Sequence, residues 1–575
     1  MVGGPLRASG RRWRLLAVAL GLGQATQLES RGAPEQSTLV LAPVIVEETV
    51  QNAPQWRYGK FREFEILSQC NDEATKSYIL QLSGQASDFR QIVPARFLLE
   101  TSLPTTFLLY PKWREKTMSV NMVRAMEDAG MQFPGSRMVP LPNLRLDEPD
   151  STFMCAIVSD GHPPASWREM FHGSGGEYVS DMSPGDQVVL SEGYIRDLIA
   201  ARAPAIPRWF AVGVSALYAL DRFEADRFAF DPEPWLSPDE VQALRAKGYE
   251  VRAMLPLTEL FVPAEPADRR AGYNRIWEAQ AELFVRWTFA GGPERRQALW
   301  NFLDRSEREP STEASFQACF GMNYGAMGAA LAKFLPTAMR LPLEWRRDPA
   351  AADPSFDLRG ATRAEVRRIQ GEWARRAAGY IGGRAPALRP VYVGQARRAL
   401  QSAYKEGDRD PRILASLGLL DVETGDVAAA LPLLEAVLAS GAEQPHALSE
   451  LARLRLVEAL GRPGAPGAHL TEQQAHRILE PIEAARRIKP PQYEAYAVAT
   501  QVCARLAQPP TARELQILNE GSWLFAQNAL LVLEAVAWDK QTGDLDQARR
   551  LVRLGEWRAT DPVLRAKLQA MGTGL

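Results

Sequence analysis

The chain of 575 residues is poor in the side chains that most metal sites and disulfide scaffolds need. It has five histidines, and no two of them lie four residues apart, which excludes a zinc site built on paired histidines of one helix. His162 and His172 remain a candidate metal pair, although histidines beside a glycine-rich loop are ordinarily solvated. The four cysteines form no CxxC motif, and their apolar neighbours indicate buried thiols rather than a disulfide framework.

The sequence also lacks a strong excess of charge of one sign, and it lacks a long apolar segment beyond its N-terminus. The formal net charge is −2, so no attraction to nucleic acid or to an anionic membrane is predicted. A transmembrane helix needs roughly 20 apolar residues, and no segment after the N-terminal region meets that requirement. We therefore expect no cofactor, no nucleic-acid partner and no membrane span in the mature chain.

The N-terminus resembles a secretory signal peptide. Four arginines precede the apolar run Leu15–Leu22, and a small-x-small cleavage site follows at Gly23-Gln24-Ala25. Removal of residues 1–25 takes away these four arginines and no acid, which lowers the formal charge from −2 to about −6. The sequence thus predicts an exported protein of the periplasm, the cell envelope or the medium, with an uncleaved N-terminal anchor as the alternative.

One stretch of the chain is basic, in contrast to the negative net charge of the whole. Between Arg363 and Lys405, ten arginines and lysines accompany only two acids, Glu365 and Glu372. Such runs are usually solvated helix faces or domain junctions, and an acidic partner is the less common explanation.

The first part of the chain alternates strand-like and helix-like segments after a disordered stretch at residues 26–37. β-branched and aromatic runs predict strands, and the polar, periodic segment from Asp72 to about Ile92 predicts a helix that Asp72 caps. The predicted strands are Thr38–Val46, Phe64–Ser68, Thr105–Tyr110 and Thr152–Ser159. This order indicates an α/β lobe.

The segment from Leu190 to Tyr218 has the frame of a catalytic helix pair without its catalytic residues. Pro207, Trp209, Phe210 and Gly213 follow an apolar helix in the order typical of P-x-W-[LF]-x-E-G. This frame resembles the gluzincin family of zinc metallopeptidases, in which the first helix carries HExxH.

The metal ligands of that family are absent from the corresponding positions. Glu192 and Arg196 stand where the family has its two histidines, and Val212 stands where it has its third ligand, a glutamate. A guanidinium stays protonated and valine has no donor atom, so neither can bind zinc. The resemblance therefore implies an inactive cleft, marked by Glu192, Arg196, Trp209 and Val212, in which Trp209 either contacts peptide or simply packs in the core.

Three further segments resemble the helical C-lobe of the same family. They are Leu255–Phe261, Tyr273–Trp287 and Phe316–Tyr324, and the last contains Phe316, Phe320 and Gly321 in the family's F-x-x-x-F-G order. Their aromatic residues also fall on one helical face, so the resemblance and the periodicity both place them in a core.

Residues 340–361 are rich in proline, arginine and aspartate without periodicity, which predicts a linker. Beyond it, ten amphipathic segments predict helices joined by short turns: Thr362–Tyr380, Val393–Lys405, Pro411–Val422, Val427–Ala439, His446–Leu460, Glu472–Ile488, Tyr493–Leu506, Ala512–Ala526, Leu530–Lys540 and Leu545–Glu556. Two turns, Thr424-Gly425-Asp426 and Thr542-Gly543-Asp544, are nearly identical, each with an alanine four residues after the aspartate. They resemble tetratricopeptide repeats, although Pro432 and the insertion Gly461–His469 depart from the repeat.

The predicted fold class is an α+β metallopeptidase-like domain with a helical C-lobe, followed by an all-α tetratricopeptide-like solenoid. The predicted divisions are 1–25, 26–37, 38–183 (α/β lobe), 184–339 (helical part), 340–361 (linker) and 362–575 (solenoid). The leading hypothesis for function is a non-catalytic scaffold that binds a protein or peptide through its helical repeats. The alternatives are a hydrolase of another class that uses the same cleft, and a structural component that assembles in the cell envelope.

Overall fold

A computed structural model describes most of the chain, and residues 54–575 form one compact unit in it. The described residues are 55–111, 144–158, 198–199, 201–218, 221–223, 227–232, 235–236, 242, 246, 254–261, 271–348, 356–461, 469–559, 561–573 and 575. The predicted signal peptide, the stretch 26–37 and the strand Thr38–Val46 lie outside them, as do His162, His172, Glu192 and Arg196.

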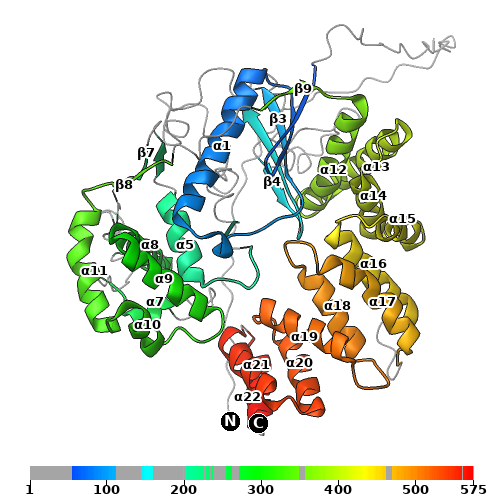
Figure 1. Ribbon diagram of the computed structural model, residues 1–575. Helices are drawn as coiled ribbons and strands as arrows, with labels where there is room; N and C mark the ends of the chain where they lie inside the picture. Colours follow the sequence, from blue (N-terminus) through cyan, green and yellow to red (C-terminus); the bar gives the residue numbers. More distant parts are fainter. Residues whose placement is uncertain are drawn as a thin grey trace, which may run out of the picture. The chain divides into compact units, whose positions relative to one another are not determined.

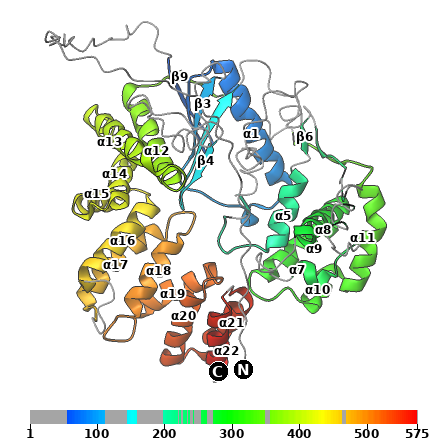
Figure 2. The same cartoon turned by 180° about the vertical axis from the view of Figure 1, so that it is seen from behind.

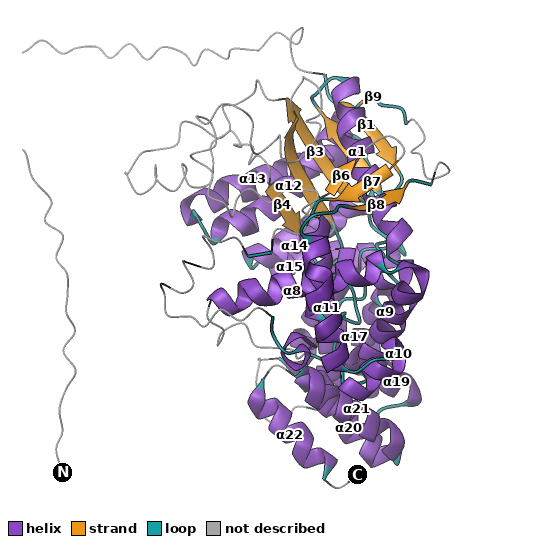
Figure 3. Cartoon of the chain, turned by 90° about the vertical axis from the view of Figure 1, so that its left-hand side faces the viewer, coloured by secondary structure: helices purple, strands orange, loops and turns teal. Residues whose placement is uncertain are grey.

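The α/β lobe is built on a mixed sheet of six strands (Figure 3). Their order is β4-β5-β3-β2-β1-β9, and the central strands β2, β3 and β5 are parallel. The strands are β1 (Arg57–Phe61), β2 (Phe64–Ser68), β3 (Thr105–Pro111), β4 (Leu144–Asp147), β5 (Thr152–Val158) and β9 (Arg359–Gly360). The three predicted strands that fall on described residues are therefore confirmed. The two edges are formed by the antiparallel strands β4 and β9.

Both faces of this sheet are mainly apolar, and β2 and β3 are buried over their whole length, as expected for parallel strands covered on two sides. One face packs on α1 (Asp72–Ile92) through alternate residues such as Ile66, Phe107 and Met154. The residues between them, such as Leu67 and Phe153, pack on α12 (Arg363–Gly382). The two helices lie on opposite sides of the sheet in both views (Figure 1; Figure 2). The lobe is therefore a three-layer α/β/α sandwich whose third layer is supplied by the distant helix α12.

The first turn of α1 differs in detail from the prediction. Its N-cap is Asn71, whose side chain accepts a hydrogen bond from the backbone N–H of Ala74 at 2.7 Å. Asp72 is the first helical residue and binds Arg57 of β1 in a two-bond pair, with both distances at 2.7 Å. The prediction of Asp72 as the cap was wrong by one residue, because asparagine and aspartate both make good caps.

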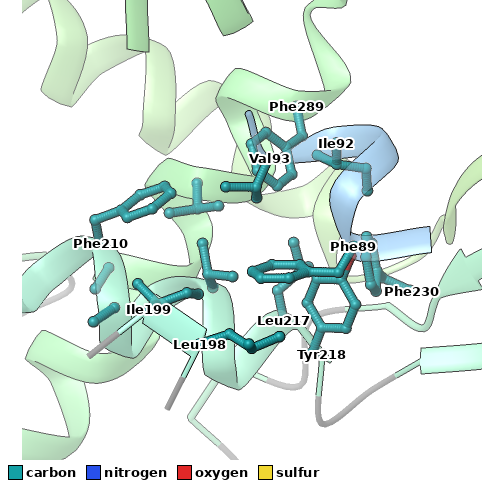
Figure 4. Packing of buried hydrophobic residues seen from close by; sticks show 14 of the residues in the cluster. Phe89, Ile92, Val93, Leu198, Ile199, Phe210, Leu217, Tyr218, Phe230 and Phe289 are labelled. Atoms are coloured by element: carbon teal, nitrogen blue, oxygen red, sulfur yellow. The ribbon is translucent and has the colours of Figure 1, made fainter. Parts of the chain in front are cut away.

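The helical part of the chain surrounds α5 (Arg208–Tyr218), which is buried along most of its length. The last turn of α1 packs against this helix through Phe89, and Phe89 and Tyr218 meet edge to face with ring centroids 4.8 Å apart (Figure 4). The other helices of this part are α7 (Leu257–Phe261), α8 (Ala271–Ala290), α9 (Gly292–Ser306), α10 (Glu313–Phe320) and α11 (Tyr324–Ala338). Their aromatic side chains form one core that is continuous with the α1 face of the sheet.

The predicted linker 340–361 holds two strands. Strand β8 (Leu343–Arg346) closes a second, three-stranded sheet with β6 (Asp221–Phe223) and β7 (Arg227–Phe230). Strand β9 then joins the edge of the main sheet beside β1. The strands were missed because they are only four and two residues long, and the alternation in β8 (Leu343–Arg346) lies within a segment rich in proline and arginine. The division of the chain into domains at these residues stays a prediction.

From α12 onward the chain forms an array of helical hairpins, here called the helical array. After α12 its helices are α13 (Arg389–Lys405), α14 (Pro411–Thr424), α15 (Val427–Ala439), α16 (Pro445–Leu460), α17 (Glu472–Ala485), α18 (Tyr493–Cys503), α19 (Ala512–Leu524), α20 (Ala529–Thr542), α21 (Leu545–Arg558) and α22 (Pro562–Gly572). All ten predicted helices are confirmed, and α22 was missed. Successive helices pack as pairs, and each even-numbered helix also contacts the next even-numbered one. None of the described helices is both long and apolar enough to cross a membrane.

The two similar turns have the same structure. Gly425 and Gly543 adopt positive φ angles of 84° and 87°, which end their helices in the left-handed conformation. Asp426 and Asp544 each accept a hydrogen bond from a backbone N–H of the following helix at 3.1 Å. Each helix is thus closed and the next one opened within two residues, as predicted.

Close packing of α5 against α8 depends on Gly213. A Cβ atom on Gly213 of α5 would lie 2.5 Å from the carbonyl oxygen of Ala281 in α8, where neither backbone can yield without moving its helix.

We therefore expect Gly213→Ala to lower the free energy of unfolding by about 1–3 kcal/mol, the usual cost of overpacking. The measurement is the melting temperature by differential scanning fluorimetry. The matched control is Gly328→Ala in α11, where a Cβ meets no atom within 4 Å. In that helix, alanine should stabilise by up to about 1 kcal/mol. Equal shifts for the two variants would contradict the proposed contact.

Candidate functional site

Helix α12 packs on the sheet through apolar side chains such as Ile369 and Trp373, and it also carries a row of buried charged residues. Its buried charged residues are Arg368, Glu372, Arg375 and the largely buried Arg376, at spacings of four, three and one residues. These spacings place them along one side of the helix. Over part of its length, the basic run of this region therefore lies at the contact between the sheet and the helical array.

The first charged cluster centres on Glu65, which lies on β2 and has no exposed surface. Its carboxylate accepts hydrogen bonds from Arg368 of α12 at 2.9 Å and from Arg412 of α14 at 2.6 Å. Burial alone would raise the pKa of Glu65, but the charges of Arg412 and Arg368 outweigh it and hold that pKa well below its usual range. One carboxylate thus joins the sheet to two helices of the array.

The second cluster centres on Glu148, in the turn between β4 and β5. Its carboxylate binds Arg375 of α12 through a very short ion pair and binds Arg376 at 2.9 Å. Burial would raise the pKa of Glu148, but the two guanidinium charges outweigh it and lower the pKa to about 2. Arg375 also donates to Glu423, at the end of α14, at 2.6 Å.

The same turn accepts hydrogen bonds from the N-terminal ends of two helices of the array. Helix α16 has no side-chain cap of its own, and the buried carboxylate of Asp150 accepts a hydrogen bond from the backbone N–H of His446 at 3.1 Å. Asp150 therefore caps α16 from the other lobe, where its charge also favours the helix N-terminus. At the start of α18, the Gln492 side chain donates to the carbonyl of Pro149 at 2.9 Å.

Two hollows adjoin these clusters. A cavity of about 20 Å³ between the turn and α14 has room for about one water molecule. A second hollow, here called the groove, has a volume of about 370 Å³ and is partly open to solvent. Its walls are strand β4, the C-terminal half of α12 and the end of α14, and its lining residues are Arg145, Leu146, Asp147, Glu148, Arg375, Arg376, Gly379, Tyr380 and Glu423.

One group of possible metal ligands lies in this region. Atoms of Glu148, Asp150 and His446 that could bind an ion lie within 4.8 Å of one another. Glu148 is already neutralised by Arg375 and Arg376, and a divalent cation at this position would face both guanidiniums. The donor set therefore does not fit a metal, and the cluster is explained by its role in the junction.

The residues predicted for the inactive cleft are placed only in part. Trp209 is 2% exposed, and its ring contacts Phe261, Phe284 and Phe302. It belongs to the core, which was the simpler of the two interpretations. Val212 is partly buried against the same core.

The junction residues on the lobe side have no direct sign in the sequence. Glu148 and Asp150 resemble an ordinary polar turn, and nothing in their spacing pairs them with α12 or α16. One signal was present: the basic run between Arg363 and Lys405 has few acids of its own, which left open a contact with acids elsewhere in the chain or in another molecule.

No protein-family model matches the chain, and no curated protein matches it. Among solved structures, a thermophilic TPR protein of Thermus thermophilus is similar at 17% identity, with a TM-score of 0.23, over 34% of this chain and 98% of that chain. PilF of Pseudomonas aeruginosa is similar at 13% identity, with a TM-score of 0.25, over 36% of this chain and 89% of that chain. Scores this low establish no shared fold, so the description of the helical array rests on its own helix pairs and turns.

The Glu148 cluster predicts a dependence of stability on pH. Because the pKa of Glu148 is lowered from its ordinary 4.5 to about 2, its contribution is complete above pH 4.5 and is lost as the pH falls toward 2. The difference corresponds to about 3 kcal/mol. We expect Glu148→Gln to lower the melting temperature at pH 7 and to flatten its decline between pH 5 and pH 3.

The control for this prediction is Glu458→Gln, which changes an exposed glutamate of α16 and should leave the whole pH profile unchanged. A profile for Glu148→Gln that runs parallel to that of the wild type would show that Glu148 does not carry the dependence.

Proposed function

We propose that the protein is a non-catalytic scaffold that binds an extended polypeptide in the groove between β4 and α12. The observation that carries this proposal is the position of the groove beside an edge strand. Among the described residues, β4 pairs only with β5, on one of its two sides. An edge strand offers backbone donors and acceptors to an added strand, and pockets beside it supply specificity.

The groove suits a segment of polypeptide in size and lining. Its volume of about 370 Å³ lies within the usual range for ligand sites. Gly379 leaves the surface of α12 bare there, since a Cβ at this position would meet no atom within 4 Å. Leu146 and Tyr380 add apolar surface to a lining that is otherwise charged.

The helical array supports the same proposal, although the sequence suggested that the helical repeats themselves would bind the partner. The starts of α14, α16 and α18 are engaged by the chain's own α/β lobe through Arg412, His446 and Gln492. This edge of the array is thus occupied within the molecule. In the proposed scaffold, α12–α18 hold the walls of the groove in place.

The finer parts of the hypothesis remain proposals. The array would be of the tetratricopeptide type, as the paired Thr-Gly-Asp turns suggest, and the helical part would descend from a gluzincin domain that has lost its metal ligands. The signal-like N-terminus supports export to the periplasm, cell envelope or medium.

A selection from a random peptide library displayed on phage tests the binding function on the full mature chain. We expect enriched sequences whose synthetic peptides bind the wild type and bind Gly379→Leu at least tenfold more weakly, because leucine fills the groove. Gly328→Leu, an open helical glycine outside the groove, is the matched control and should bind normally. Absence of enrichment, or equal binding by Gly379→Leu, would refute peptide binding in the groove.

The proposed lack of catalysis has its own test. We expect well below one equivalent of zinc per chain after incubation with zinc and desalting of protein purified without a metal-binding tag. The physical reason is that the positions corresponding to metallopeptidase ligands hold Glu192, Arg196 and Val212. Stoichiometric zinc would overturn the proposal of an inactive cleft, and His162 and His172 would then be the first residues to substitute.

A further inference from the structure

The groove contains three acids and three arginines, so its net charge does not identify a ligand. The acids are Asp147, Glu148 and Glu423, and the arginines are Arg145, Arg375 and Arg376. The partners of each acid decide which kind of charge the groove can still accept.

Two of the acids each have an arginine that they do not share with Glu423, although the side chain of Asp147 is half exposed. Glu148 binds both Arg375 and Arg376. Asp147 binds Arg145 at 2.8 Å and also accepts a hydrogen bond from the hydroxyl of Thr152 at 2.8 Å. An anionic ligand would have to compete with these carboxylates for their guanidiniums, which is unfavourable at Glu148, whose two pairs are largely buried.

Glu423 differs from the other two. Its Oε1 accepts one bond from Arg375, which Glu423 must share with Glu148. Its side chain is 34% exposed, so a ligand in the groove can reach it. Burial raises the pKa of Glu423, and although Arg375 opposes this, the nearby charge of Glu148 adds to it. The negative charge of Glu423 is thus the least compensated in the groove, and an added cation would favour it.

We propose that the groove selects polypeptides with a basic side chain, whose ammonium or guanidinium group binds the carboxylate of Glu423. This inference rests on the proposed polypeptide-binding function and assigns its ligand class. A long basic side chain fits because its apolar stem can lie along Leu146 and Tyr380 while its charged end reaches Glu423. Strand β4 would form hydrogen bonds with the peptide backbone, and Glu423 would select a basic side chain of the peptide.

The test uses capped peptides from the selection in which one central position is lysine, arginine, acetyl-lysine or glutamate, measured by fluorescence anisotropy. We expect the lysine and arginine peptides to bind at least tenfold more tightly than the acetyl-lysine and glutamate peptides. The salt dependence should follow the same order, since a charge-assisted bond weakens with ionic strength.

The variant Glu423→Gln separates recognition from a structural effect. It should bind lysine and acetyl-lysine peptides equally, whereas a variant that merely loosened the groove would weaken both and keep the difference between them. Glu458→Gln, an exposed glutamate of α16, is the matched control and should keep the wild-type preference.

The failures of the two proposals can be told apart. Peptides that bind, and that lose binding in Gly379→Leu, but that show no preference for a basic residue would overturn this inference and leave the groove as a polypeptide site. A preference for glutamate, or a lysine preference that survives in Glu423→Gln, would also overturn it. If no peptide binds in the groove at all, the proposed function itself fails.

Discussion

The buried ion pair between Glu65 and the guanidiniums of Arg368 and Arg412 is the contact on which the arrangement of the α/β lobe and the helical array depends. A carboxylate on a central strand, without exposed surface, is costly unless it is paired. Both partners are on helices that follow it by some 300 residues or more. Such a pair adds little net stability compared with apolar packing, but it tolerates few alternative placements of α12 and α14. Specificity of docking is its main contribution.

Much of the secondary structure could be predicted from local pattern, and the reasons differ between elements. The strand at Thr105 is a short run of β-branched and apolar residues, the strand at Phe64 is apolar apart from Glu65 and Ser68, and the array helices are marked by caps such as Asp426 and by the glycines before them. Strands β8 and β9 were not predicted, because a pattern of two to four residues is too short to stand out from the proline- and arginine-rich sequence around it. Helix α22 was overlooked although Asp561 and the following proline mark its start.

The candidate site was beyond prediction for a different reason. Each of its charged residues has an unremarkable neighbourhood in sequence, and the site exists only because a turn at Glu148 meets helices that are more than 200 residues away. Ile369 and Trp373 form the apolar side of α12 and are buried, but a polar side such as that of Arg375 is normally solvated. Only the shortage of acids near the basic run pointed to a partner, and it could not say which.

The third layer of the sheet has a consequence for how the chain acquires its structure. Tyr58, Leu67, Leu108 and Phe153 are covered by α12, which is synthesised long after the strands that carry them. Until then one whole face of a largely parallel sheet is bare, and such surfaces are prone to aggregate. During synthesis this exposed face of the sheet would need to be covered by a chaperone or by another part of the chain until α12 is made. A truncated gene product that ends before α12 would keep the face exposed permanently.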